Sequence, residues 1–259
     1  MTFSAAELLQ WLAGYVWPFV RIGAMLTAMA AIGTKMVPLR IRTLLTFAVT
    51  LVVVPTLPAM PEVALFSVQG MLITALQVLV GVAMGFVSVM VMQVMVLAGQ
   101  VIAFQASLGF AAMVDPVSGQ QTPVVSQFFL NLAILIFFAI NGHLWMLEML
   151  HHSFFVLPVG SDGIGLPDFH AIALFGSTLF ASALGMAIAE IIALLLINLA
   201  FGFMTRAAPQ LNIFTIGFPI IMLSGLLILW VTAGTVLEHF LHSWQQGQSL
   251  MCDLLGSSC

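Results

Sequence analysis

The sequence predicts an all-α membrane protein. Of its 259 residues, 62% are apolar and only 5% are charged, whereas an ordinary soluble domain has roughly 25% charged residues. The mean hydropathy is +1.20, and nine acidic and five basic side chains cannot cover the surface of a water-soluble globule of this size. Several apolar runs are also long enough to cross a bilayer as helices.

The same composition excludes several classes of function. The formal net charge is −4, and the five Lys and Arg residues form no basic stripe or tail, so we exclude nucleic-acid binding. Cys252 and Cys259 form no C-x-x-C pair and cannot build a disulfide framework, which argues against zinc, iron–sulfur or redox chemistry. The sequence has no G-x-x-x-x-G-K-[ST] nucleotide loop, so we expect no cofactor and no motor within the chain.

Apolar runs define the expected helices. A helix needs about 20 apolar residues to cross the hydrocarbon layer, and polar residues, Pro and Gly divide the chain into runs of about that length or more. Six segments result, at about residues 11–33, 43–60, 66–106, 124–157, 170–204 and 211–237. We expect residues 1–237 to form a single helical domain and residues 238–259 to form a polar C-terminal tail.

The first segment combines aromatic residues with a proline and an arginine. Trp11, Tyr15 and Trp17 precede the first basic residue, Arg21, and such rings favour the membrane interface. A cleavable signal peptide begins with a basic region, so we expect this segment to be retained. Pro18 predicts a kinked helix, in which the guanidinium of Arg21 is held by carbonyls or by another subunit.

Prolines end the second segment, and the third is unusually long. Pro55, Pro58 and Pro61 punctuate the connection between the two. The third segment has about twice the length that a bilayer requires, so it must tilt, split near Gly81 and Gly85, or project out of the membrane. These two glycines also form a G-x-x-x-G element, which permits close helix packing.

The connection after the third segment changes from apolar to polar. Residues 105–116 read QASLGFAAMVDP, and residues 117–123 read VSGQQTP. An apolar loop at membrane depth persists only where protein buries it or where it faces a water-filled cavity. Phe110 and Met113 are therefore candidates to close a pore by excluding water.

Polar side chains in the fourth segment give only weak support for a metal site or a catalytic site. His143, His151 and His152 surround Glu148, but no H-E-x-x-H spacing is present, and paired histidines near a segment end are more often interfacial. The sequence also lacks a G-x-S-x-G nucleophile motif. We therefore expect neither a metal site nor an enzyme.

Glu190 lies in the middle of the fifth segment. Burying an ionisable group in the membrane is costly, so it is a candidate functional residue by default. Three interpretations remain open: the carboxyl is protonated, it is hydrogen-bonded to Asn198 or Ser182, or it belongs to a proton path.

Between the fifth and sixth segments, residues 206–219 read RAAPQLNIFTIGFP. This combination of a base, two prolines and two amides indicates a structured junction.

The basic residues predict a topology. Lys35, Arg40 and Arg42 lie between segments one and two, and Arg206 lies between five and six. In a six-span chain these loops fall on the same side, which the positive-inside rule makes cytoplasmic. The loops on the other side carry only acidic charges. We therefore expect both termini to be periplasmic, in a bacterial inner membrane.

Short motifs along the chain resemble those of the FliR/SctT family, the R-type subunits of the type III secretion export gate. They are W-P-F-x-R at 17–21, G-F at 109–110, V-D-P at 114–116, N-G-H-L-W at 141–145, and R-x-x-P-Q-x-N-I-F-x-x-G-F-P at 206–219. The last motif is specific, and the resemblance extends over nearly the whole chain.

The resemblance implies a fold of long kinked hairpins, similar to one P-type and one Q-type subunit joined in a single chain. It implies that one copy assembles with P-type and Q-type subunits into the channel entrance for unfolded flagellar proteins, largely raised above the bilayer plane. The B-type and A-type export proteins are further expected partners, together with membrane lipid. Energy would come from an associated ATPase and from proton-motive force acting through a larger partner.

The resemblance also implies roles for individual residues. The 106–122 loop corresponds to the family's plug, and its candidate gating residues are Leu108, Gly109, Phe110 and, less securely, Met113. The candidate junction and subunit contacts are Arg206, Pro209, Gln210, Asn212, Phe214, Gly217, Phe218 and Pro219. The candidate intersubunit or buried polar residues are Arg21, Asn141, His143 and Glu190.

Two other classes of function remain as alternatives. An ion-coupled secondary transporter would use a midplane site formed by Glu190, Arg21 and Asn198. A membrane enzyme would depend on His143. Dependence on partners distinguishes these readings, because a transporter folds and acts alone, whereas a gate subunit exposes large apolar faces without its neighbours.

Overall fold

The computed structural model of the chain is all-α, as the sequence predicts. The structure describes residues 5–34, 36–61, 63–109, 123–160, 165–207 and 217–256, and no strand occurs among them. The helices are α1 (Ala5–Ala28), α2 (Leu39–Val53), η1 (Val54–Thr56), α3 (Val68–Gln105), α5 (Val124–Ala139), α6 (Gly142–Val156), α7 (Leu166–Ala207), α8 (Phe218–Thr232), η3 (Ala233–Thr235) and α9 (Val236–Leu254).

Every segment predicted from the sequence contains helix, but not every one is a candidate membrane span. Four described helical stretches are long and apolar enough to cross a membrane: Leu39–Thr56, Val68–Gln105, Asp168–Ala207 and Phe218–Leu254. Helices α5 and α6 are bent by 64° and add a fifth if the pair counts as one span. Helix α1 is not among these stretches; it contains Pro18 and the buried Arg21.

Helix α3 is one continuous helix of 38 residues. At about 1.5 Å per residue it extends roughly 57 Å, against about 30 Å for the hydrocarbon layer. The chain does not divide at Gly81 or Gly85, so one of the three explanations for the long third segment does not apply. Tilting and projection out of the membrane both remain compatible with its length.

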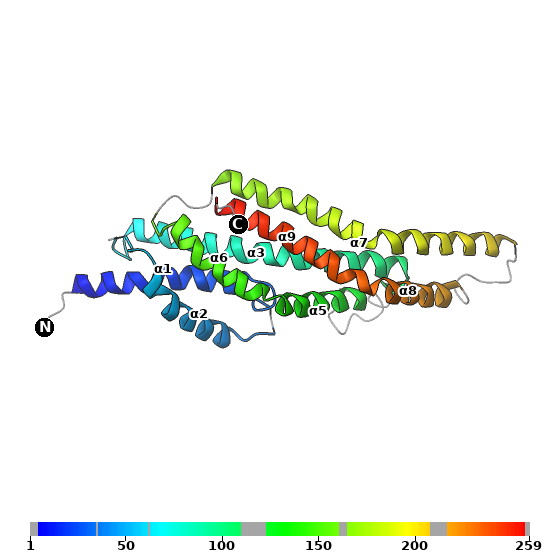
Figure 1. The fold of residues 1–259 in the computed structure, drawn as a ribbon, viewed down its shortest axis with the longest axis horizontal. Coiled ribbons are helices and arrows are strands. Elements are labelled where there is room, and N and C mark those ends of the chain that lie inside the picture. Colours follow the sequence, from blue (N-terminus) through cyan, green and yellow to red (C-terminus); the bar gives the residue numbers. More distant parts are fainter. Residues whose placement is uncertain are drawn as a thin grey trace. The chain divides into compact units, whose positions relative to one another are not determined.

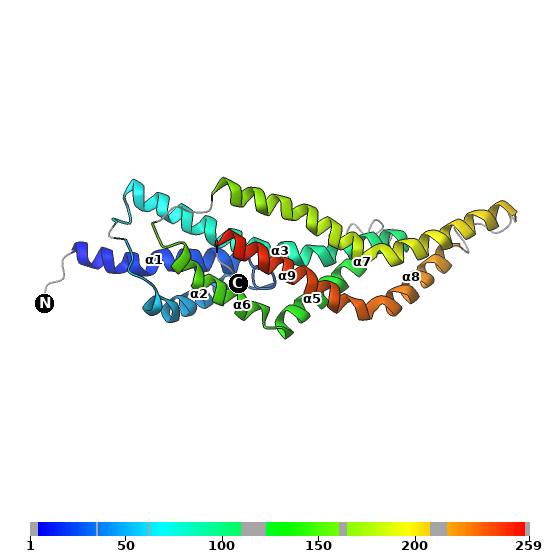
Figure 2. The ribbon, with the colours of Figure 1, turned by 45° about the horizontal axis from the view of Figure 1, so that its top comes forward.

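The chain divides into two compact units, which we describe separately. Unit 1 comprises Met1–Met90, Phe137–Phe175 and Gln246–Cys259, and unit 2 comprises Val91–Ile136 and Gly176–Gln245. In unit 1, α2 packs against α1, and the two helices lie side by side in both ribbon views (Figures 1 and 2). Helices α3, α5, α7 and α9 each contribute residues to both units.

Small residues bring α3 close to α1 in unit 1. A Cβ atom added at Gly85 would lie 2.6 Å from the Met25 carbonyl oxygen and 2.7 Å from the Cβ of Ala28. One turn earlier, Gly81 meets α1 in the same way at Ala24. The G-x-x-x-G element of the sequence therefore acts in packing, as such motifs do in membrane helices.

Unit 2 has a second close helix contact. A Cβ atom at Gly225 of α8 would lie 2.5 Å from the Cβ of Ala106, directly after α3, and 3.8 Å from Cδ2 of Leu194 on α7. Helix α8 also runs beside the C-terminal part of α7 in both ribbon views (Figures 1 and 2). Three segments that are distant in sequence therefore meet at Gly225.

Most of the segment expected to be a polar tail is an amphipathic helix. Helix α9 begins at Val236 and ends at Leu254. Phe240, Trp244 and Met251 are buried on one side of it, whereas polar residues such as Gln245 are exposed. The spacing of these apolar residues follows the helical period, so the sequence itself carries the signal for this helix.

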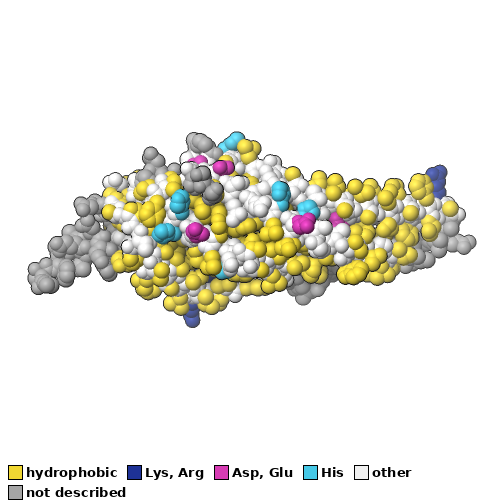
Figure 3. Space-filling view, viewed as in Figure 1, with side chains coloured by type: hydrophobic (Ala, Val, Ile, Leu, Met, Phe, Trp, Pro, Cys, Tyr) yellow, Lys and Arg dark blue, Asp and Glu magenta, His cyan; other side chains and the backbone are white. Residues whose placement is uncertain are grey.

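Apolar surface is covered very unevenly. Within the apolar 18-residue part that qualifies each stretch as a span, 67% of the residues of α3 are buried within the chain, against 11% in Leu39–Thr56, 28% in Asp168–Ala207 and 17% in Phe218–Leu254. Hydrophobic side chains accordingly cover much of the visible face in Figure 3. These helices need lipid or other protein subunits to cover them.

Candidate functional site

A buried arginine joins three helices of unit 1. Arg21 on α1 is 1% exposed, and its Nε donates a hydrogen bond of 2.7 Å to Oε1 of Gln77 on α3. Its Nη1 donates to the carbonyl oxygen of Ser153 at 3.0 Å and to the Ser153 hydroxyl at 3.2 Å. Its Nη2 donates to the carbonyl oxygen of Leu157 at 2.9 Å. The guanidinium carbon lies 4.3 Å from the ring centre of Phe154.

Arg21 acts as a cap for the C-terminal end of α6. The last carbonyl groups of a helix lack partners within the helix, and a positive charge is favourable there. Ser153 lies in the last turn of α6, and Leu157 is its C-terminal cap. Arg21 makes no ion pair with any residue that the structure describes, so these carbonyls, Gln77 and the Phe154 ring compensate its burial.

The Asn141–Gly142–His143 motif forms the bend between α5 and α6. Asn141 has a left-handed backbone conformation with φ of 57°, which asparagine tolerates better than most residues. A Cβ atom at Gly142 would lie 2.5 Å from two ring atoms of Phe137, so only glycine fits under this ring. His143 packs its ring against Phe138 at 5.1 Å. The bend is thus encoded locally by three adjacent residues.

The histidines of α6 do not gather around a common point. His151 shares a 2.9 Å hydrogen bond between its Nε2 and Oγ1 of Thr56. The Nδ1 atom of His143 is buried and has no hydrogen-bond partner among the described residues. Within the described part of the chain, no group of three or more His, Cys, Asp or Glu side chains is placed to hold a metal ion.

The structure describes the base of the 106–122 loop. Ser107 has a left-handed conformation with φ of 60°, which ends α3 and turns the chain. Gly109 is buried against the ring of Phe104, because a Cβ atom there would approach Cδ1 to 2.5 Å. Leu108 is half-buried between them. The candidate plug residues Phe110 and Met113 lie outside the described residues.

Glu190 is a buried carboxyl group in unit 2. Its side chain is 4% exposed, and Oε2 has no hydrogen-bond partner among the described residues. Ser182 and Asn198 are each eight residues away on the same helix, about 12 Å along its axis, so neither is a local partner. Glu190 shares the buried face of α7 with Leu194, one turn further on.

The junction after α7 is described at its two ends. Arg206 is exposed in the last turn of α7, where a positive charge complements the helix dipole. Gly217 is the N-terminal cap of α8, and Phe218 and Pro219 form its first turn. Proline suits this position because its missing N–H would have no helical partner. Pro209, Gln210, Asn212 and Phe214 lie outside the described residues.

These features define a multi-helix membrane protein with a buried polar centre in unit 1 and extensive uncovered apolar faces. The sequence pattern of the family described as bacterial export proteins, family 1, matches residues 12–247. The chain belongs to this family.

Relatives match over almost their full length. The flagellar biosynthetic protein FliR of Pectobacterium carotovorum subsp. carotovorum is 34% identical over 255 residues, which cover 98% of this chain and 97% of the relative. The protein of the same name from Escherichia coli (strain K12) is 32% identical over 252 residues, covering 97% and 96%. That from Bacillus subtilis (strain 168) is 28% identical over 208 residues, covering 78% and 79%. The resemblance to FliR that the motifs indicate is thus confirmed.

Proposed function

We propose that the chain is a non-enzymatic core subunit of the flagellar type III export gate. In this proposal it assembles with P-type and Q-type subunits into the channel entrance for unfolded flagellar proteins. Its membership of the bacterial export family and the flagellar names of its relatives support this function. The B-type and A-type export proteins are further partners in the same assembly.

The observation that carries the proposal is the uncovered apolar surface of α2, α7 and α8. On α2, Leu44 and Val52 are exposed to 68% and 75%, and on α8, Trp230 is exposed to 75%. By contrast, α3 buries most of its apolar stretch within the chain. A subunit whose neighbours complete its core has this distribution, because each uncovered helix provides a face for a neighbouring helix.

We assign the plug to the 106–122 loop. The N-terminal end of this loop is anchored, because Gly225 of α8 packs against Ala106 and the ring of Phe104 covers Gly109. A closing loop needs such an anchored base, so that its apolar side chains reach a constant position in the pore. Phe110 and Met113 supply those side chains, and the softer thioether of Met113 seals less tightly than an aromatic ring.

We assign the segment from Arg206 to Pro219 to the architecture of the complex. Pro219 presets the first turn of α8, and Gly217 is buried next to it. In this proposal Pro209, Gln210, Asn212 and Phe214 complete the junction and contact neighbouring subunits. Substitutions at Pro209 or Gly217 then lower the yield of the whole complex, because each changes the backbone of the junction.

We place the protein in a bacterial inner membrane, partly raised toward the periplasm, with both termini periplasmic. The basic residues Arg40, Arg42 and Arg206 support this orientation by the positive-inside rule. Cys252 is buried near the end of α9, and the other cysteine of the sequence, Cys259, lies outside the described residues.

Partner dependence tests the proposed function. The tagged chain is expressed alone and together with its P-type and Q-type neighbours, then extracted in mild detergent and examined by size-exclusion chromatography. We expect aggregation or loss of the chain expressed alone and a defined complex after co-expression, because the neighbours cover α2 and α8. A well-behaved, partner-free protein would contradict the proposal.

The buried carboxyl of Glu190 keeps a second function open. An ion-coupled transporter needs an ionisable group within the membrane, and Oε2 of Glu190 has no partner among the described residues. However, Arg21 belongs to unit 1 and Glu190 to unit 2, and the donors of Arg21 are bound to Gln77, Ser153 and Leu157. Its use as a substrate-binding cation would require breaking these bonds.

A further inference from the structure

Two adjoining cavities of unit 1 form a surface groove. The first has a volume of about 480 Å³ and lies between α3 and the beginning of α7. The second has a volume of about 330 Å³ and lies between α1, α2 and α3. Val78 and Val82 of α3 line both cavities, so the two adjoin along this face of α3. We refer to the two cavities together as the α3 groove.

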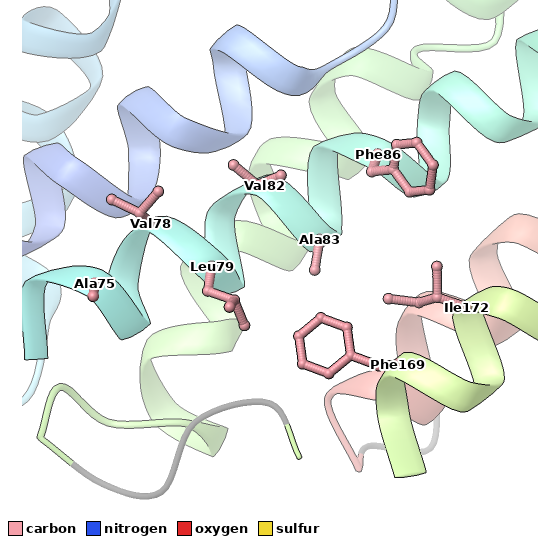
Figure 4. A pocket seen from close by; sticks show the side chains of 8 residues that line it. All are labelled: Ala75, Val78, Leu79, Val82, Ala83, Phe86, Phe169 and Ile172. Atoms are coloured by element: carbon pink, nitrogen blue, oxygen red, sulfur yellow. The ribbon is translucent and has the colours of Figure 1, made fainter. Parts of the chain in front are cut away.

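The end of the α3 groove at α7 is apolar. Figure 4 shows Leu79 and Ala83 of α3 facing Phe169 and Ile172 of α7 across the cavity. All eight residues that line this cavity are apolar. Val82 remains 42% exposed and Phe169 40% exposed, so this end is open at the surface. It therefore suits a hydrocarbon chain.

The opposite end of the α3 groove carries a positive charge. Arg42 of α2 lines it, together with the threonines Thr27, Thr43 and Thr46. The guanidinium is held in place because Nε donates to the carbonyl of Val37 at 3.1 Å and Nη2 donates to that of Thr34 at 2.6 Å.

One donor group at this end remains free. The Nη1 atom of Arg42 makes no hydrogen bond to any residue within the described ranges. The three threonine hydroxyls already donate to helix carbonyls: Thr27 to Gly23, Thr43 to Arg40 and Thr46 to Arg42. Arg42 is thus the group at this end that can donate to an anion.

We propose that the α3 groove binds one anionic membrane phospholipid, with its phosphate at Arg42 and an acyl chain along Val78 and Val82 toward Phe169. Arginine binds phosphate oxygens through charge-assisted hydrogen bonds, and the apolar end matches the acyl chain. The predicted topology places Arg42 at the cytoplasmic surface, where anionic lipids concentrate and attract basic residues.

The charged end of the groove favours a lipid over an apolar helix of another protein. Small-molecule pockets commonly have volumes of roughly 300–1,000 Å³, and the end at Arg42 provides an anion site that an apolar helix would leave unused.

Native mass spectrometry of the full chain, with whatever subunits co-purify, tests this proposal. The protein is titrated with dioleoylphosphatidylglycerol and, separately, with the zwitterionic dioleoylphosphatidylcholine in the same detergent. We expect a one-lipid adduct that forms at roughly five-fold lower concentration with phosphatidylglycerol, the preference that one basic residue supplies near a membrane surface. Equal binding of the two lipids would overturn the proposal.

Three variants locate the binding site. Arg42→Gln should remove the roughly five-fold preference, whereas Arg40→Gln, which changes an exposed arginine of the same helix outside the groove, should keep it. Val82→Trp places a bulky ring where the two cavities adjoin, leaves the charge of Arg42 in place, and should abolish the adduct of either lipid. Circular dichroism checks that each variant is folded. If Arg42→Gln unfolds, the loss of the lipid adduct in Val82→Trp tests the proposal instead.

Two results would overturn the assignment of the lipid to this groove. One is a one-lipid adduct that persists at full intensity in folded Val82→Trp. The other is efficient crosslinking of a photoreactive residue at position 82 to another subunit in intact membranes, which would show that protein covers the groove. We expect a photoreactive residue at position 82 to crosslink to lipid. We expect one at position 44, on the far side of α2, to form no lipid crosslink.

Discussion

Nε of Arg21 donates a 2.7 Å hydrogen bond to Oε1 of Gln77, and both side chains are buried. The two residues lie 56 positions apart on α1 and α3, so the bond fixes how these helices are aligned. One turn before Arg21, Nε1 of Trp17 donates to Oγ1 of Thr74 at 3.2 Å. The guanidinium of Arg21 also caps α6, which makes it the central polar contact of unit 1.

Replacing Arg21 should therefore destabilise unit 1. Arg21→Met keeps an apolar stem but leaves Oε1 of Gln77 and the carbonyls of Ser153 and Leu157 without their donor. We expect a loss of about 3 kcal/mol in the free energy of unfolding. Gln77→Met, which removes one acceptor, should cost about 1 kcal/mol. Thermal melting of the purified protein, followed by circular dichroism, measures both.

Arg40→Met is the matched control for this experiment. Arg40 is exposed at the start of α2, so its replacement should leave the melting temperature nearly unchanged. If Arg21→Met melts at the same temperature as Arg40→Met, the hydrogen bonds around Arg21 do not stabilise the unit.

The contact between Gly225 and Ala106 predicts a rescue. In Gly225→Ala the new Cβ would lie 2.5 Å from the Cβ of Ala106, so α8 must shift and the yield of folded protein should fall. Ala106→Gly in the same chain removes the obstacle and should restore most of the yield. Fluorescence-detected size-exclusion chromatography of the tagged single and double variants measures the recovery.

Gly202→Ala provides the control for an added methyl group. A Cβ atom at Gly202 meets nothing within 4 Å, and alanine is favoured over glycine in a helix by roughly 1 kcal/mol. This variant should be as stable as the original protein or more stable. A double variant Ala106→Gly, Gly225→Ala that recovers no better than Gly225→Ala alone would mean that another contact of Gly225 is responsible.

The proposed plug predicts leakage without loss of assembly. Replacing Phe110 and Met113 with alanine removes the apolar side chains that exclude water, while the base around Ala106 and Gly109 is untouched. Complexes with both substitutions should form in normal yield and conduct ions in planar bilayers, and cells should take up small dyes. Conductance equal to that of the original complex would remove these residues from the gate.

Glu190 distinguishes the gate from a transporter. Glu190→Gln keeps the shape of the side chain and removes its capacity to bind and release a proton. The gate proposal predicts normal yield of the complex and normal flagellar export, measured as swimming and as flagellin secreted into the medium. Loss of export with normal assembly would show that the carboxyl acts in transport, as the alternative requires.

Much of the architecture follows from hydrophobicity alone. Apolar runs predicted the helices because lipid-exposed backbone must satisfy its hydrogen bonds internally, and Gly81 with Gly85 correctly indicated a close helix contact. Helices are harder to predict where the sequence is polar. The polarity of residues 238–254 predicts a tail, whereas the apolar spacing through Phe240, Trp244 and Met251 matches the helical period.

The partners of individual polar residues were less predictable. Arg21 was expected to be held by carbonyls or by another subunit, but nothing in the local sequence identifies Gln77, Ser153 or Leu157, which are 56 or more residues away. Such contacts depend on how helices distant in the sequence align. The bend at Asn141–Gly142 is different, because its left-handed conformation and the close approach of Phe137 arise within a few residues.

Native mass spectrometry of the tagged chain, co-expressed with its P-type and Q-type neighbours and extracted in mild detergent, tests the central claim most directly. Our account predicts a hetero-oligomer of defined mass that contains a single copy of this chain, since its uncovered apolar helices are completed by the other subunits. A stable partner-free monomer or homo-oligomer would contradict the account and would make the transporter interpretation of Glu190 the next to test.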